Sequence, residues 1–286
     1  MRRIRLLRHV LPVILICGLG AHGQTHADRK EWIQLFNGRD LEDWAVKIRG
    51  YDLDDNFGNT FRVEDGLLKV AYDAYESFDN RFGYIFYKQK FSHYIIAVEY
   101  RFVGDQVPGG PNWARRNSGI MVHSPPPETM GKDQDSPVSI EVQLLGGLGE
   151  GERPTANLCT PGTHVVMEGK LVTRHCITSR SETFHGDQWV RVETMVLGDS
   201  TVRHTVNGEG VLSYEMPQIG DESVSGFDEK GKQDGKLLRD GYISLQSESH
   251  PIEFRKVELL NLAGCMDREA SNYKSYYVKS DSSQCR

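Results

Sequence analysis

Apolar and polar side chains alternate with a period of two through most of this 286-residue chain. In the segment from Tyr94 to Phe102, Ile96 and Val98 fall on one face and Glu99 on the other. Successive side chains of a strand point to opposite faces, so this pattern predicts strands that cover a core with one face. The same pattern predicts strands within residues 61–70, 139–145, 189–197, 201–214, 241–248 and 252–260.

Turn signals separate these segments. Asp65-Gly66 and Asn207-Gly208 are dipeptides typical of two-residue β-hairpin turns. No amphipathic helix longer than about two turns is predicted. Many short strands with turns between them favour an all-β, antiparallel sandwich or barrel, and we predict a two-sheet jelly roll.

The N-terminus has the three parts of a secretory signal peptide. Residues 1–9 carry four arginines and no acid, residues 10–21 are apolar, and small residues follow up to Ala27. The apolar run is shorter than the roughly 20 residues of a spanning helix, so no transmembrane span is predicted. We expect residues 1–27 to be removed and the mature protein to be secreted or periplasmic. Lipid attachment at Cys17 is an alternative, which the bulky Ile16 before it disfavours.

The charge excludes some partners. The whole chain has a formal net charge of −6. Removal of the four signal arginines makes the mature chain more acidic still, and no basic tract is present. An acidic surface is unsuited to nucleic acid or to an anionic membrane. The oligomeric state is left open.

Four cysteines remain after removal of the signal peptide, namely Cys159, Cys176, Cys265 and Cys285. An even number in an exported chain predicts two disulfides, and the local pairing is Cys159 with Cys176 and Cys265 with Cys285. A zinc site is the rival interpretation, but the spacing matches no zinc pattern.

The predicted domain organisation has three parts: the signal peptide 1–27, a jelly-roll domain over 28–262 and a small cysteine-framed tail over 263–286. Three long loops, at 105–116, 124–137 and 218–239, interrupt the jelly roll, and loops of this length in a compact domain are usually functional or disordered. Polar residues are concentrated on strands that the pattern places centrally: Arg101, His123, Glu141, Gln143 and Gln246. We therefore expect one concave, functional sheet face.

Four sequence blocks resemble, in order, the bacterial 3-keto-disaccharide hydrolase family, formerly a domain of unknown function. They are residues 32–44 with Leu35-Phe36-Asn37-Gly38, residues 117–120, residues 141–143, and residues 241–246 continuing to 254–257. The resemblance covers about residues 31–262 and implies a concanavalin-like or laminin-G-like jelly roll. The tail resembles a short repeat at the ends of exported bacterial proteins, but its ending at Cys285 departs from the repeat's pattern, which weakens any calcium-binding role.

The resemblance also implies a substrate class, glycosides already oxidised to a ketone at sugar carbon 3. Such a ketone acidifies the hydrogen on carbon 2. Removal of this proton by a base gives an enediolate, from which the group on carbon 1 leaves by elimination, and water added afterwards makes the net reaction a hydrolysis. This route needs a base, donors to the enediolate oxygen and an acid for the leaving group.

Four residues are candidates for the chemistry. Glu141 is the favoured base, because it faces away from the core on a strand with apolar neighbours; a solvated or ion-paired carboxylate is the alternative. His123 and His250 are candidate acids or donors, with surface or loop histidines as their alternatives. Arg101 is a candidate to stabilise the enediolate or to pair with Glu141.

Sugar binding is predicted for Asn117, Gln143 and Gln246 through hydrogen bonds, and for Trp113 through stacking on a sugar face. No cofactor is certain. A divalent metal held by His123, Glu141 and His250 is an alternative, since it would also stabilise an enediolate. No phosphate-binding or dinucleotide fingerprint occurs.

Two other functions stay open. One is a non-catalytic carbohydrate-binding module on the same fold, which needs aromatic and amide side chains but no cluster of ionisable ones. The other is an ordinary glycosidase, which needs a second carboxylate near Glu141, for which Glu99 and Glu248 are eligible.

Overall fold

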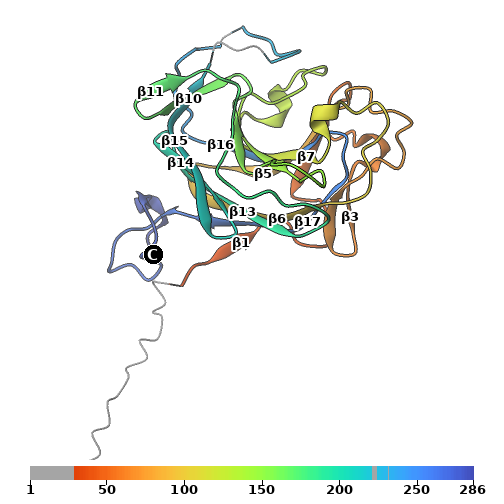
Figure 1. The fold of residues 1–286 in the computed structure, drawn as a ribbon. Helices are drawn as coiled ribbons and strands as arrows, with labels where there is room; N and C mark the ends of the chain where they lie inside the picture. Colours follow the sequence, from red (N-terminus) through yellow and green to blue (C-terminus); the bar gives the residue numbers. More distant parts are fainter. Residues whose placement is uncertain (1–28, 221–223, 231) are drawn as a thin grey trace, which may run out of the picture.

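Two antiparallel sheets pack face to face around one core in the computed structural model of the protein (Figure 1). The structure describes residues 29–220, 224–230 and 232–286, so the predicted signal peptide lies outside the described residues. The arrangement is an all-β jelly roll, which confirms the predicted fold class. Within the described residues, the only helical segments are short 3-10 turns at Phe57–Asn59, Asn112–Ala114, Pro127–Thr129 and Ser282–Gln284.

The larger sheet has ten strands. Its order is β11 (Lys170–Val172), β10 (Thr163–Met167), β15 (Glu209–Ile219), β14 (Thr201–Val206), β13 (Val190–Leu197), β6 (His93–Phe102), β17 (Ile252–Asn261), β4 (Leu67–Val70) and β3 (Phe61–Glu64), and β1 (Trp32–Gln34) pairs with β17.

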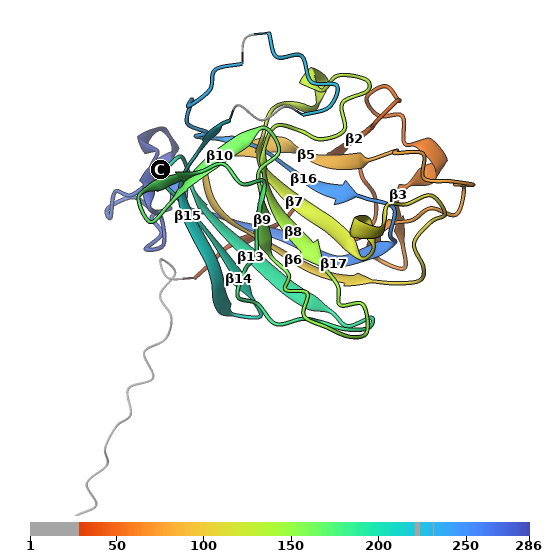
Figure 2. The ribbon, with the colours of Figure 1, turned by 45° about the horizontal axis from the view of Figure 1, so that its top comes forward.

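The smaller sheet has seven strands and carries the functional site described below. Its order is β12 (Cys176–Ile177), β9 (Asn157–Cys159), β8 (Ile140–Leu145), β7 (Asn117–Ser124), β16 (Gly241–Ser247), β5 (Gly83–Phe91) and β2 (Trp44–Ile48). Figure 2 shows β7, β8, β9 and β16 side by side in this layer.

The core lies between the two sheets and follows from the alternation. Ile120, Val142 and Leu245 of the smaller sheet are completely buried against Val98 and Phe254 of the larger one. The opposite side chains of the same strands face away from the core. A shift of one residue in strand register would exchange these two faces, so core burial determines which polar side chains reach the outer surface.

One strand that the alternation does not reveal is β5. Ile85 and Tyr87 of this strand face the core, but Tyr84 and Phe86 on its other face are also buried, in a second cluster with Met121 and Met130. The loop that follows β7 covers this second cluster. Because both faces of β5 are apolar from Gly83 to Tyr87, this part of its sequence lacks the period of two.

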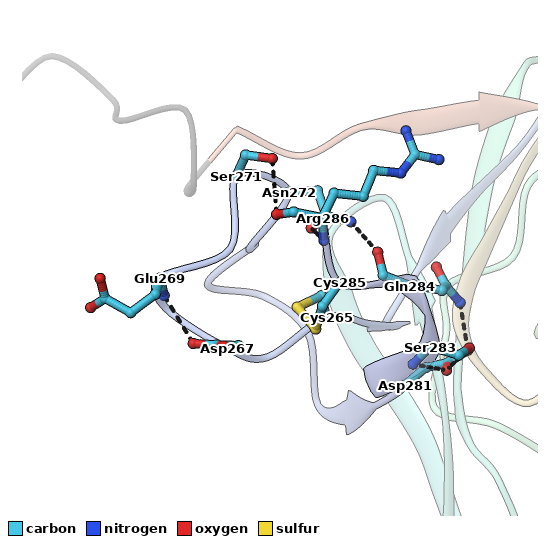
Figure 3. The surroundings of a disulfide bond; sticks show 10 residues. All are labelled: Cys265, Asp267, Glu269, Ser271, Asn272, Asp281, Ser283, Gln284, Cys285 and Arg286. Atoms are coloured by element: carbon cyan, nitrogen blue, oxygen red, sulfur yellow. Dashed lines mark hydrogen bonds between the residues drawn. A yellow bond between two sulfur atoms is a disulfide. The ribbon is translucent and has the colours of Figure 1, made fainter.

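The predicted disulfide pairing is confirmed. Cys159 bonds to Cys176 across β9 and β12, and Cys265 bonds to Cys285 within the tail. Figure 3 shows the tail closed by Cys265–Cys285 and by hydrogen bonds, among them Asn272 Nδ2 to the Gln284 carbonyl oxygen at 2.6 Å. Two short parallel strands, β18 (Ala263–Gly264) and β19 (Lys279–Ser280), complete the tail.

The tail lies beside the start of β1 (Figure 1), where the Lys274 ammonium pairs with Glu31. It lines neither of the two cavities described below. No helix among the described residues is long and apolar enough to span a membrane.

The core assignment predicts a large difference between two leucines. Leu245 is fully buried and Leu171 is 55% exposed. We expect Leu245→Ala to lower the free energy of unfolding by about 2–5 kcal/mol, because it removes buried methyl groups and leaves a cavity. Leu171→Ala should change it by less than about 0.5 kcal/mol. Urea unfolding with both disulfides intact measures the two values, and equal effects would contradict this core.

Candidate functional site

A cavity of about 760 Å³ opens on the outer face of the smaller sheet. Its floor comes from three adjacent strands: β7 contributes Asn117, β8 contributes Glu141 and Gln143, and β16 contributes Gln246. Glu248 follows the end of β16. The period of two brings these side chains to one face, because their strand neighbours fill the core.

Two carboxyl groups are buried in this floor. Glu141 is 7% exposed and Glu248 is 6% exposed. Loss of hydration raises the pKa of Glu141. The pKa of Glu248 is also raised, first by loss of hydration and then by the nearby charge of Glu141. The positive charge of Arg153 lowers the pKa of Glu248, but by less than the other two effects raise it. Among the described residues, neither carboxylate forms a salt bridge with a lysine or an arginine. The pair therefore keeps a proton to higher pH than an exposed carboxyl group would.

Gly119 of β7 makes room for this arrangement. A Cβ atom at this position would lie 2.9 Å from both Cγ and Oε1 of Glu141, and 3.0 Å from Oε1 of Gln246. Any larger residue would displace one of these side chains. The missing side chain thus allows Glu141 and Gln246 to approach each other across β7.

Several polar atoms of the floor are buried without a hydrogen-bond partner. They are Asn117 Oδ1, Gln246 Oε1 and Glu248 Oε2. Buried polar groups are nearly always paired in folded proteins, so three such atoms on residues that line one cavity indicate that water or a polar ligand binds there.

Hydrogen bonds orient the two glutamine amides in opposite ways. Gln246 Nε2 donates to Glu248 Oε1 at 2.9 Å and to the Tyr84 hydroxyl at 3.2 Å, so the Gln246 oxygen is the atom left without a partner. Gln143 Oε1 instead accepts from Asn157 Nδ2 at 3.0 Å, which leaves the Gln143 amide nitrogen as a donor. The floor therefore offers both acceptors and donors.

The walls of the cavity combine aromatic and sulfur-containing residues with polar ones, the latter being Arg49, Asn80, Asp135, Ser136, His175 and Ser225. Cys159 is the cross-strand partner of Glu141, so the Cys159–Cys176 disulfide lies beside that carboxyl group, and His175 lines the same wall. On another side, Trp113 stacks on Phe82 with ring centroids 6.0 Å apart. The carboxyl pair on the floor between them is almost completely buried.

The structure brings together five of the eight predicted site residues. Glu141, Asn117, Gln143, Gln246 and Trp113 all line the cavity. The expectation that Arg101 shares this face is wrong, because β6 belongs to the other sheet. There Arg101 pairs with Glu253 at 2.7 Å and lies over the Trp189 ring.

Neither predicted histidine lines the cavity. His123 has a left-handed backbone (φ 60°), and its buried ring lies near the backbone of Gly198 and Asp240. His250 follows Ser249, which also has a positive φ of 80°, and packs against Phe102 with ring centroids 5.7 Å apart. Burial lowers the pKa of each histidine to about 4. At His123 the positive φ departs from the extended backbone on which the predicted strand face depends, and His250 was predicted only as a residue that follows the end of a strand.

The metal alternative named His123, Glu141 and His250, and the structure does not bring these three together. The one cluster of potential ligands among the described residues is Cys159, His175 and Cys176. Both of its cysteines are joined in a disulfide, which removes the thiolates that bind metals.

Sequence reasoning assigned no role in this site to Tyr84, Arg49 or Arg153, and it considered Glu248 only as the second acid of an ordinary glycosidase. Glu248 lies two residues beyond Gln246, so the period of two could have placed it on the same face. Arg153 could not be predicted, because it comes from a loop and donates to the carbonyl oxygens of Gly146 and Arg116 at 2.6 and 2.9 Å. Glu99, the other eligible acid, pairs with Arg191 and Arg255 on the larger sheet.

Fold and cavity together define a jelly-roll protein with a buried, carboxyl-lined cavity. The chain belongs to the family of 3-keto-alpha-glucoside-1,2-lyase-like domains, whose model matches residues 31–260. This confirms the family resemblance of the four sequence blocks, and the family makes the protein a carbohydrate-active one. No curated protein sequence matches the chain.

Solved structures with a similar fold include three of different description. A proposed glycosyl hydrolase from Parabacteroides distasonis is 18% identical, with 81% of this chain and 100% of that chain covered and a TM-score of 0.49. A Bacillus licheniformis β-glucanase is 9% identical, with 81% and 98% covered and a TM-score of 0.44. The carbohydrate-binding module CBM66 from Bacillus subtilis is 9% identical, with 63% and 82% covered and a TM-score of 0.39.

The raised pKa values predict how stability depends on pH. At Glu141 and Glu248 the folded chain binds more protons than the unfolded chain above pH ~4.3, the ordinary pKa of a glutamate. The contribution of these two groups to the free energy of unfolding should therefore fall as pH rises towards the raised values. The buried histidines His123, His204 and His250, whose pKa values are lowered to about 4, contribute in the opposite direction below pH ~6.5. Glu248→Gln keeps the shape but cannot ionise. We expect this variant to gain stability relative to the natural protein between pH 5 and 8, by up to about 1.4 kcal/mol per pH unit.

Urea unfolding at several pH values measures this difference. Glu209→Gln, which removes an exposed carboxyl group from the hairpin of β14 and β15, is the matched control and should follow the natural protein at every pH. A curve for Glu248→Gln that runs parallel to that of the natural protein would show that Glu248 is not a desolvated acid.

Proposed function

We propose that this protein cleaves 3-keto-glycosides by abstraction of the proton on carbon 2 and elimination at carbon 1, followed by addition of water. The observation that carries the proposal is the pair of buried carboxyl groups, Glu141 and Glu248, among unpartnered polar atoms in one cavity. Family membership supports the substrate class.

Glu141 is the base in this proposal. Its ionised form takes the proton from carbon 2, and the electron pair of the broken C–H bond moves into the double bond of an enediolate. The Gln143 amide nitrogen, which Asn157 leaves as a donor, stabilises the charge on the oxygen of carbon 3. A carboxylate that has lost its hydration is a stronger base than an exposed one, which suits this weakly acidic proton.

Glu248 is the acid. As the enediolate collapses, the ketone at carbon 3 re-forms, a double bond forms between carbons 1 and 2, and the bond from carbon 1 to the leaving oxygen breaks. Glu248 gives its proton to that oxygen. Glu141 is then protonated and Glu248 ionised, and transfer of a proton between the two, directly or through solvent, restores the starting state. Water added across the new double bond completes a net hydrolysis.

The mature protein, incubated with a 3-keto-glucoside and with its unoxidised parent, tests this reaction. We expect release of the leaving group from the keto compound only, because only the ketone makes carbon 2 acidic. Glu141→Gln should lower kcat by about 10²–10⁴-fold, the usual contribution of a general base. Glu209→Gln should have no effect, and treatment with EDTA tests dependence on a divalent metal.

Two other outcomes separate the alternative functions. Cleavage of the unoxidised parent would favour an ordinary glycosidase. Such an enzyme uses two carboxyl groups, and this cavity contains two. If calorimetry detects sugar binding but neither compound is cleaved, the protein is a non-catalytic carbohydrate-binding module.

Gly119 provides an independent test of the geometry. Gly119→Ala adds a methyl group within 3.0 Å of Glu141 and Gln246 and should lower kcat by about tenfold or more, because misplaced catalytic groups react slowly. Gly210→Ala is the matched control, since no atom lies within 4 Å of its added Cβ. Unchanged activity in Gly119→Ala would show that the observed position of the Glu141 carboxyl group is not needed for catalysis, and would contradict its proposed role.

We also propose that the mature protein works outside the cytoplasm. Its two disulfides suit an oxidising compartment. N-terminal sequencing of the protein recovered from the periplasm or the medium tests removal of residues 1–27, and recovery of the intact chain from the cytoplasm alone would contradict it.

A further inference from the structure

The connection that carries Glu248 has an unusual backbone. Strand β16 ends at Ser247, and the chain passes through Glu248 and Ser249 before β17 begins at Ile252. Ser249 has a positive φ of 80°. This conformation is uncommon for a serine and costs free energy, so the surrounding contacts must hold it. The position of the neighbouring Glu248 therefore depends on what holds Ser249.

Three hydrogen bonds hold Ser249. Its backbone N–H donates to the Tyr72 hydroxyl at 2.8 Å, and its carbonyl oxygen accepts from the Val107 N–H at 2.9 Å. Its side-chain oxygen accepts from Gln106 Nε2 at 2.8 Å. Because Ser249 is completely buried, bulk water cannot readily replace a partner that is removed. Two of the three bonds come from the loop at residues 105–116.

Gln106 also holds this loop together. The same Nε2 atom donates to the Pro111 carbonyl oxygen at 2.9 Å, and Pro111 and Trp113 line the cavity. The packing around the amide is close, since a Cβ atom at Gly110 would lie 2.6 Å from both Gln106 Nε2 and Ser249 Oγ. Gln106 itself does not line the cavity. It thus joins the connection that carries Glu248 to a wall of the site from outside the cavity.

We propose that Gln106 is a positioning residue, which acts through Ser249 to hold the Glu248 carboxyl group where it can protonate the leaving oxygen. The inference rests on the proposed function, in which Glu248 is the acid. Protonation matters most for a strongly basic leaving oxygen, such as that of methanol, and least for that of 4-nitrophenol. Loss of Gln106 should therefore slow a substrate with a basic leaving group more, a pattern that general loss of structure would not produce.

Two 3-keto-glucosides, a methyl and a 4-nitrophenyl compound, test this assignment. Gln106→Met keeps the length of the side chain but loses both donated hydrogen bonds. We expect it to lower kcat about tenfold for the methyl compound and by less than about twofold for the nitrophenyl compound, with little change in KM. Glu248→Gln should show the same pattern more strongly. Gln34→Met is the matched control, because it removes an amide bond to Glu258 of 2.9 Å on the larger sheet, and it should leave both rates unchanged.

A double-mutant cycle tests whether the effect passes through Ser249. Ser249→Ala removes the acceptor of the Gln106 bond. If Gln106 acts through this bond, the double variant should be no slower on the methyl compound than the slower single variant. Effects that multiply would overturn the assignment. So would equal slowing of the two substrates by Gln106→Met, or an unchanged rate with the methyl compound.

Urea unfolding decides the matter if the reaction itself fails. The proposed function fails if the natural protein cleaves neither compound, or if Glu248→Gln slows both equally. The charged and titratable groups around Glu248 are Glu141 on β8, Tyr84 on β5, Tyr72 and Arg153, and the comparison changes none of them.

The comparison measures how much stability Glu248→Gln gains between pH 5 and 8, with Gln106 present and with Gln106→Met. A carboxyl group that is no longer held in its buried position regains hydration, so its replacement by an amide matters less. We expect the gain to fall by about half or more in the Gln106→Met protein. An undiminished gain would show that Gln106 does not position Glu248 and would overturn the assignment, whatever the fate of the reaction.

Discussion

The functional site depends on one physical constraint: two carboxyl groups, those of Glu141 and Glu248, are removed from water. Loss of hydration makes an ionised carboxylate costly, and no lysine or arginine among the described residues forms a salt bridge with either group to compensate. Buried carboxyl groups with a raised pKa are typical of sites that transfer protons, where their function offsets the loss of stability. Glu141 and Glu248 lie on the floor of the cavity, and the disulfide Cys159–Cys176 lies beside Glu141 on the neighbouring strand.

The alternation of side chains along the strands of the jelly roll is enough to place the polar residues of the cavity floor. Core packing on one face of β7, β8 and β16 directs Asn117, Glu141, Gln143 and Gln246 to the other face without any special backbone geometry. Gly119 supplies the space that a side chain would otherwise fill. Loops then add what strands cannot provide, namely the aromatic wall at Trp113 and the arginines at the periphery. The residues of the proposed chemistry thus come from the sheet and from the residue that follows β16.

Much of this could be predicted from the alternation alone. The strands with one apolar face, such as β6 and β8, were predicted because polar and apolar residues alternate along them, and so was the orientation of Glu141 away from the core. Alternation cannot say which sheet a strand joins, so Arg101 was placed on the wrong face. It also fails where a residue adopts a positive φ, as at His123 and Ser249. β5 was missed because both of its faces are buried from Gly83 to Tyr87.

The fate of the hydrogen on carbon 2 tests the central claim most directly. A 3-keto-glycoside carrying deuterium at carbon 2 would be cleaved in ordinary water, and the sugar product analysed by mass spectrometry against free deuterated 3-keto-glucose kept under the same conditions. Proton abstraction by Glu141 predicts a slower reaction than for the undeuterated compound and a product that has lost the deuterium to solvent. A product that retains the deuterium, formed at an undiminished rate, would show that the bond at carbon 1 breaks without proton abstraction and would contradict the proposed role of the buried carboxyl pair.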